Sequence, residues 1–203
     1  MSVFTHEADS NVPTPAVQTP FPDMDTIQLN EESILKLLRN IIPRKASGPD
    51  NIPARILRDC DSDLALILTM IFQTSLKEGK VSDDWTQTNV TALYKKGSRQ
   101  DPGKCRPVSL TSLCCKLLEH IIVSQTMKHL ERHKILHDCQ HGFRARKSYE
   151  TQLLTLAHEL AESLDKRTQT DMIILDFSKA FDRVPHQRLL KKVHHYDIRG
   201  RTL

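Results

Sequence analysis

The chain has 203 residues, of which 38% are hydrophobic and 27% are charged, with a formal net charge of +4. This composition is typical of a soluble globular protein with one domain or two small ones. No apolar run approaches the roughly 20 residues that span a bilayer, and the N-terminus lacks the pattern of a signal peptide. Five cysteines, two of them adjacent, favour reduced thiols over a disulfide framework. We therefore expect an intracellular protein of the cytoplasm or nucleus, with no membrane partner.

Charge is unevenly distributed along the chain. Residues 1–35 contain six acids and no Lys or Arg, whereas residues 94–150 contain twelve Lys or Arg and five acids. Phosphate neutralisation supplies most non-specific affinity for nucleic acid, so a basic middle segment suggests a polyanionic partner. A solvated basic face explains the same charge equally well, and charge alone leaves both interpretations open.

The first part of the chain predicts a leader and a helix. Four prolines without a periodic apolar pattern indicate an extended or disordered leader over residues 1–26. A helix is expected after Asn30, with acids in its first turn and an apolar stripe that ends before Pro43.

A tight turn and a second helix follow. Gly48-Pro49 marks the turn, and Asn51 tolerates left-handed backbone geometry. The second amphipathic helix is expected to end at Gly79. Its predicted inward residues are Leu64, Ile67, Leu68, Ile71 and Phe72.

The middle of the chain predicts a hairpin. Residues 88–95 and 106–110 have strand composition, and the polar segment between them contains the Gly and Pro of a loop. Thr111 or Ser112 can then cap a long helix.

This helix is expected to run on far enough to include three histidines that repeat every four residues. His129, His133 and His137 would lie along one helical face, and Cys139 and His141 follow. Because His and Cys bind zinc, a zinc-binding helix is one alternative function. The Cys-x-x-Cys spacing typical of structural zinc sites is absent from the sequence.

The last part of the chain predicts a helix and a buried strand. Ser148 can cap a helix whose predicted inward residues are Leu153, Leu156, Ala157, Leu160 and Leu164. Residues 172–175 are four consecutive apolar residues, which indicate a strand buried on both faces. Asp176 follows directly, and a carboxylate is costly to bury unless it is paired or holds a metal. Taken alone, a strand, a turn and a helix with capping acids explain this segment as well.

The segment Leu175-Asp-Phe-Ser-Lys-Ala-Phe-Asp-Arg-Val-Pro-His186 resembles the first catalytic motif of reverse transcriptases from non-LTR (LINE-type) retrotransposons. Three upstream segments resemble the same family in the same order. These are the Gly-Pro-Asp turn at 45–53, the fingers hairpin at 93–110, and Gln140-His-Gly-Phe-Arg144 with the Ser148 that follows. Cys105 departs from the pattern, because an aromatic residue is common at that position.

The resemblance implies an α+β fold that comprises the fingers and the beginning of the palm of a right-hand polymerase. It would be mostly helical, with a fingers β-hairpin and one buried palm strand. Residues 27–203 would form a partial reverse transcriptase domain, with the fingers over about 44–165 and the start of the palm over about 166–203.

Complete members of this family carry a later aromatic-x-Asp-Asp motif and a thumb. Neither follows Asp176, and the pair Asp83-Asp84 lies far upstream. Two-metal chemistry needs more ligands than Asp176 alone supplies. We therefore expect a truncated chain that does not polymerise by itself.

The resemblance also assigns the site. RNA template, DNA primer and dNTPs would be the partners, and Mg²⁺ would be the cofactor in the complete enzyme. Asp176 would be catalytic and would hold the metal, with the Phe177 carbonyl as a second ligand. The remaining implied contacts are Lys95 and Arg106 to the triphosphate, Phe181 beneath the deoxyribose, and Arg144, Arg146 and Lys147 to nucleic-acid phosphates.

Two further hypotheses stay open beside the polymerase. One is a relic that binds nucleic acid without chemistry, which the basic middle segment favours. The other is that an incomplete palm exposes unpaired strand edges and does not fold stably.

Overall fold

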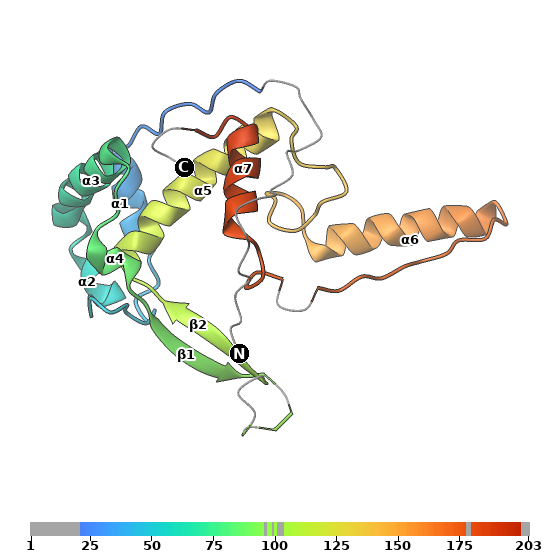
Figure 1. Ribbon diagram of the computed structural model, residues 1–203, viewed down its shortest axis with the longest axis horizontal. Coiled ribbons are helices and arrows are strands. Elements are labelled where there is room, and N and C mark those ends of the chain that lie inside the picture. The colour runs from blue at the N-terminus through green and yellow to red at the C-terminus, as the bar shows by residue number, and fades with distance from the viewer. Residues whose placement is uncertain (1–20, 96, 99, 101–103, 178–179, 200–203) are drawn as a thin grey trace. The chain divides into compact units, whose positions relative to one another are not determined.

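The computed structural model describes residues 21–95, 97–98, 100, 104–177 and 180–199 (Figure 1). Their elements are α1 (Glu31–Arg39), α2 (Ala54–Asp59), α3 (Asp61–Glu78), α4 (Asp83–Thr86), β1 (Asn89–Tyr94), β2 (Cys105–Leu110), α5 (Leu113–Arg132), α6 (Tyr149–Asp165) and α7 (His186–His195). This mixture of helices with a small antiparallel sheet confirms the α+β class.

The chain divides into two compact units. The described part of the first unit comprises residues 21–24, 127–177 and 180–198. That of the second comprises residues 25–95, 97–98, 100 and 104–126 with Arg199. Within the described part of the chain, no helix is both long and apolar enough to cross a membrane.

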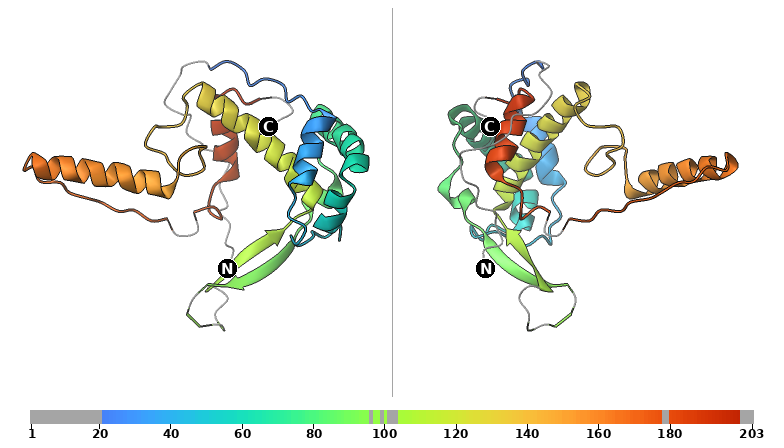
Figure 2. Two further views of the ribbon diagram at one scale, coloured as in Figure 1. Left: turned by 180° about the vertical axis from the view of Figure 1, so that it is seen from behind. Right: turned by 45° about the vertical axis from the view of Figure 1, so that its right-hand side comes forward.

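The second unit contains the hydrophobic core. Helices α1, α2 and α3 gather around the beginning of α5 (Figure 2). Phe72 of α3 is fully buried, and its ring contacts Trp85 edge-on, with 5.7 Å between the ring centroids. The other buried core residues with at most 5% exposure are Ile34, Leu38, Ala54, Leu57, Ala65, Leu68, Leu113 and Leu118.

Local signals in the sequence explain where these helices begin and end. The Asn30 side chain accepts a hydrogen bond from the Ser33 N–H at 2.8 Å, which confirms the predicted start of α1. α1 ends at Arg39, one turn before Pro43. Gly79 ends α3 with φ 67°, the left-handed geometry expected of a glycine at this position.

The predicted inward face of α3 is partly wrong. Ala65, Leu68, Thr69 and Phe72 are buried, whereas Ile67 is 52% exposed and Ile71 is 43% exposed. Apolar residues occur on most sides of this helix, so their spacing does not fix its rotation. Ala65 is fully buried, and the Thr69 hydroxyl is satisfied because it donates to the Ala65 carbonyl at 2.7 Å.

Gly48, in the turn that precedes α2, packs against the backbone that leads into α5. A Cβ atom on Gly48 would lie 2.5 Å from the backbone nitrogen of Ser112 and 2.6 Å from the carbonyl carbon of Thr111. Only glycine fits this close approach of two backbones. Asn51 adopts φ 54°, as predicted, and its N–H donates to the Gly48 carbonyl. The turn is therefore fixed against the residues that lead into α5.

The predicted hairpin is confirmed. β1 and β2 pair antiparallel, with Asn89 opposite Leu110 and Tyr94 opposite Cys105. The ladder continues for one further pair, because the Lys95 N–H donates to the Lys104 carbonyl at 3.0 Å. Residues 96, 99 and 101–103 of the predicted loop lie outside the described residues.

The predicted row of three histidines is only partly formed. The rings of His129 and His133 lie side by side, with 4.8 Å between their centroids. α5 ends at Arg132, and Lys134 turns the chain with φ 52°, so His137 does not continue the helical face of His129. His129 is buried, and its Nε2 atom lies 2.8 Å from the Tyr196 carbonyl oxygen. Among the described residues, no three His, Cys, Asp or Glu side chains group to hold a metal ion. The zinc-binding helix therefore lacks its predicted geometry.

Two predictions of burial near the C-terminus are also wrong. α6 begins as predicted with a capping box of Ser148 and Thr151, yet none of its described residues is buried. Residues 172–175 form no strand, and Ile173 and Ile174 are each 83% exposed. A buried strand needs neighbouring strands, and the described residues contain a single sheet, in which β1 and β2 pair only with each other.

Most of the predicted leader lies outside the described residues. Its described end, residues 21–26, has no helix or strand. The Phe21 ring contacts the Tyr196 ring edge-on at 5.7 Å, and the Met24 N–H donates to the Asp197 carbonyl at 3.0 Å. This part of the leader is thus held against the end of α7.

We expect Gly48→Ala to destabilise the chain by about 1–3 kcal/mol, because the added methyl group forces two backbones apart. Urea unfolding followed by circular dichroism measures this change. Gly142→Ala is a matched control, since a Cβ on Gly142 meets no atom within 4 Å. Equal effects of the two substitutions would contradict the importance of the close approach.

Candidate functional site

The hairpin brings two of the predicted nucleotide-binding residues to one face. Arg106 lies opposite Leu93 in the register, and Lys95 follows Leu93 by two residues. Side chains alternate along a strand, so Lys95 and Arg106 leave the same face as diagonal neighbours, about 7–8 Å apart. Both side chains are exposed. This face can therefore present two cations to one anion.

Sequence reasoning missed a third cation in the hairpin. Lys104 lies across from Lys95 at the end of the ladder, and its side chain is exposed. The signal that identifies it is the register, since counting outward from the paired strands places residue 104 opposite residue 95.

Asp176 lies in an exposed segment that is neither helix nor strand, rather than at the end of a buried strand. Leu175 and Phe177 on either side of it are 79% and 78% exposed. A carboxylate and a backbone carbonyl are the hard oxygen donors that Mg²⁺ prefers, so the chemistry of Asp176 and Phe177 fits this ion. Their assignment as metal ligands stays a prediction.

Phe181 contacts an aromatic ring from another segment of the predicted site. The centroids of Phe181 and Phe143 lie 5.9 Å apart, and the ring planes form an angle of 82°. Phe143 adopts φ 59°, which is uncommon for a bulky residue. The sequence contains no signal for this contact, because the two residues lie 38 positions apart.

Arg144 is engaged within the protein. Its Nε donates to Glu131 Oε1 at 2.8 Å, its Nη2 donates to Glu131 Oε2 at 2.7 Å, and its Nη1 donates to the His137 carbonyl at 2.8 Å. The side chain is only 9% exposed. The guanidinium hydrogen bonds hold the pKa of the Glu131 carboxyl below its usual value. Arg144 thus ties the turn at 137–144 to the last turn of α5.

The other two predicted phosphate contacts differ from each other. Lys147 is half-buried and donates to the Asp138 carbonyl, so it supports the same turn. Arg146 is exposed and adopts φ 62°. His141 Nδ1 lies 2.8 Å from Thr151 Oγ1, which connects the turn to the cap of α6. Of the three predicted cations, Arg146 is the one whose side chain faces solvent.

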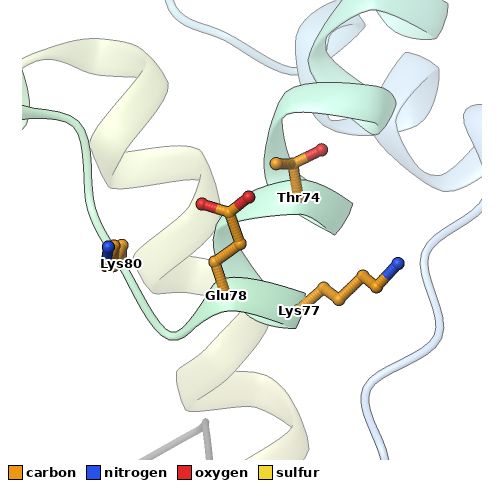
Figure 3. Close-up of a pocket in the computed structure, with 4 residues that line it drawn as sticks. All are labelled: Thr74, Lys77, Glu78 and Lys80. Carbon is orange, nitrogen blue, oxygen red and sulfur yellow. The ribbon is translucent and has the colours of Figure 1, made fainter.

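A hollow of about 550 Å³ lies at the end of α3 (Figure 3). Its lining residues are Thr74, Lys77, Glu78 and Lys80. None of the predicted site residues lines this hollow, so we do not assign it to the site.

The comparison with protein families and the comparison with known proteins agree with each other. The family described as "Reverse transcriptase (RNA-dependent DNA polymerase)" matches residues 93–202, slightly more than half of the chain. The chain is 29% identical over 193 residues, 93% of its length, to the RNA-directed DNA polymerase from mobile element jockey of Drosophila funebris. It is 28% identical over 163 residues, 80% of its length, to the probable RNA-directed DNA polymerase from transposon BS of Drosophila melanogaster.

A third relative is the retrovirus-related Pol polyprotein from type-1 retrotransposable element R2 of Popillia japonica, with 28% identity over 62% of the chain. The matched segments cover 21% of the jockey protein, 18% of the transposon BS protein and 17% of the R2 protein. The chain thus spans about a fifth of the length of the curated relatives that it matches.

We expect the Arg144–Glu131 pair to make stability depend on pH below about 4.3, the usual pKa of a glutamate. The pKa of folded Glu131 is lowered, so the pair stabilises the fold above the unfolded pKa, and this contribution is lost as pH falls through the folded pKa. Urea unfolding between pH 3 and pH 7 measures it.

Arg144→Gln is expected to lower the urea concentration at the midpoint of unfolding near neutral pH. It is also expected to remove the part of the stability that the pair loses as the pH falls. Lys166→Gln is a matched control, because it breaks an exposed pair with Glu162 that contributes little. An unchanged pH dependence in Arg144→Gln would show that the pair does not carry the effect.

Proposed function

The chain belongs to the reverse transcriptase (RNA-dependent DNA polymerase) family, of the kind that non-LTR retrotransposons encode, and we propose that it supplies the nucleotide-binding and template-binding part of such a polymerase. The observation that carries this proposal is the basic face of the β1–β2 hairpin, whose residues Lys95 and Arg106 lie within the matched residues 93–202. Arg106 offers a planar fork to phosphate oxygens, and Lys95 adds a compact charge beside it.

The reaction that we propose for the complete polymerase is phosphoryl transfer. The primer 3′-hydroxyl loses its proton to solvent and attacks the α-phosphorus of a dNTP. The new bond from the 3′-oxygen to the α-phosphorus forms as the bond from the α-phosphorus to the oxygen of the β-phosphate breaks, and pyrophosphate leaves. Asp176 and the Phe177 carbonyl would hold Mg²⁺, which when bound favours the nucleophilic form of the hydroxyl and neutralises the leaving group. Lys95 and Arg106 would orient the triphosphate for this attack.

Phe181 is proposed to select deoxyribose. Its ring would lie beneath the sugar, where its bulk leaves no room for a 2′-hydroxyl. The edge-on contact with Phe143 supports this role, because it restricts the Phe181 ring from one side. Phe143 would in turn be held by the turn that Arg144 ties to α5.

For template binding, we propose different roles for the three predicted cations Arg144, Arg146 and Lys147. Arg146 would contact nucleic-acid phosphates directly, since its side chain is exposed. Arg144 and Lys147 would position the turn that presents Arg146, because both already donate to carbonyl groups within it.

A non-catalytic nucleic-acid-binding protein is the second candidate. The surplus of Lys and Arg over residues 94–150 favours it, because phosphate neutralisation alone can supply affinity. The two candidates differ in Asp176, which matters to the polymerase and is irrelevant to simple binding.

We expect Arg146→Gln to weaken binding of a fluorescent RNA–DNA hybrid a few-fold and to reduce the log–log salt slope by about one. Fluorescence anisotropy between 50 and 200 mM salt measures both quantities, a range over which electrostatic binding changes by orders of magnitude. Lys166→Gln is the control for a general loss of one charge. An unchanged salt slope in Arg146→Gln would contradict a direct phosphate contact.

Asp176→Asn distinguishes the two candidates. In the polymerase, it is expected to weaken the Mg²⁺-dependent part of dNTP binding and to leave hybrid binding unchanged without Mg²⁺. In a simple binding protein, neither quantity changes.

A further inference from the structure

Two lysines face each other at the end of the hairpin ladder. The Lys95 N–H donates to the Lys104 carbonyl at 3.0 Å, so the two residues form the pair that follows Tyr94 and Cys105. Residues directly opposite in an antiparallel pair have Cβ atoms about 4.5–5.5 Å apart. Arg106, two residues from Lys104, is the diagonal neighbour of Lys95. Three cations thus meet within one short stretch of hairpin.

The surrounding sequence does not neutralise this charge. Between Thr86 and Leu118 the chain contains one acid, Asp101, which lies outside the described residues. Like charges directly opposite each other destabilise a hairpin. All three cationic side chains are exposed, and β1 is exposed along its whole length. A multiply charged anion on this face would turn the repulsion into attraction.

The Lys104 stem also has a defined place. A Cβ atom on Gly97 would lie 3.4 Å from Cγ and from Cδ of Lys104, and 3.5 Å from Cε. Gly97 adopts φ 92°, and its carbonyl accepts a hydrogen bond from the Tyr94 hydroxyl. The aliphatic stem of Lys104 therefore crosses the bend next to Gly97, and its ammonium group remains in solvent.

We propose that Lys104 is a third phosphate-binding residue of the hairpin, which binds the triphosphate of a nucleoside triphosphate together with Lys95 and Arg106. This inference rests on the proposed function, in which Lys95 and Arg106 bind the same group. It adds a residue that the register and the Gly97 contact identify.

The spacing of the charges favours a triphosphate over a nucleic-acid backbone. A triphosphate carries several negative charges on adjacent phosphate groups. A nucleic-acid strand carries one charge per phosphate, and a sugar separates each phosphate group from the next. Three cations gathered on two opposed residues and one diagonal neighbour match the more compact anion.

Isothermal titration calorimetry of the 203-residue chain tests the proposal, with inorganic tripolyphosphate and Mg²⁺–dTTP as probes. Lys104→Gln is expected to weaken both affinities by about five- to tenfold, as for the loss of one charge-assisted contact. Lys104→Arg keeps the cation and is expected to retain most of the affinity. Lys80→Gln, which removes an exposed cation outside the hairpin, is expected to change neither affinity.

The same experiment separates this inference from the proposed function. If Lys95→Gln and Arg106→Gln weaken binding and Lys104→Gln does not, the inference fails and the proposed function stands. If the unsubstituted chain binds neither probe, both fail. If Lys104→Gln weakens binding of single-stranded RNA but not of either probe, Lys104 binds a nucleic-acid backbone and the inference is overturned. Circular dichroism of each variant confirms that the fold is retained.

Discussion

The contact of Gly48 with the backbone at Thr111 and Ser112 is the constraint on which the hairpin depends. β1 is exposed along its whole length, so the hairpin buries little apolar surface of its own. An isolated two-stranded hairpin is marginally stable in water. Its base, however, continues directly into α5, and Gly48 fixes that junction against the core around Phe72. The basic face is therefore carried on a short sheet whose base is anchored.

A second constraint operates in the other unit. The bidentate pair of Arg144 and Glu131 closes the turn at 137–144, which contains Phe143 and leads to Arg146. Exposed ion pairs contribute little to stability, but this guanidinium is largely buried and also donates to a backbone carbonyl. Arg144 therefore has a structural role in this arrangement, whereas the family resemblance alone implies that it contacts phosphate. Residues that hold a turn and residues that contact a ligand can lie side by side in one motif.

Burial was the hardest property to predict. The stretch 172–175 has the composition of a buried strand, yet it is exposed, because burial requires neighbouring strands that are absent from the described residues. The apolar stripe of α6 has the right spacing and no covering partner among the described residues. The composition of a segment indicates which residues favour burial, but the packing of the surrounding elements decides whether they are buried. For the same reason, the spacing of apolar residues in α3 did not predict which side of the helix faces the core.

The sequence by itself determined the family, the capping of α1 and α6, the left-handed turn at Asn51 and the antiparallel hairpin. Each depends on residues close together in the chain, such as Asn30 with Ser33 or Ser148 with Thr151. Only the tertiary structure decided that Phe143 meets Phe181, that α5 ends before His137 can align with His129 and His133, and that Lys104 lies across from Lys95. These depend on register, on packing and on where a helix ends. Such features are set by contacts between distant residues, which local propensity does not encode.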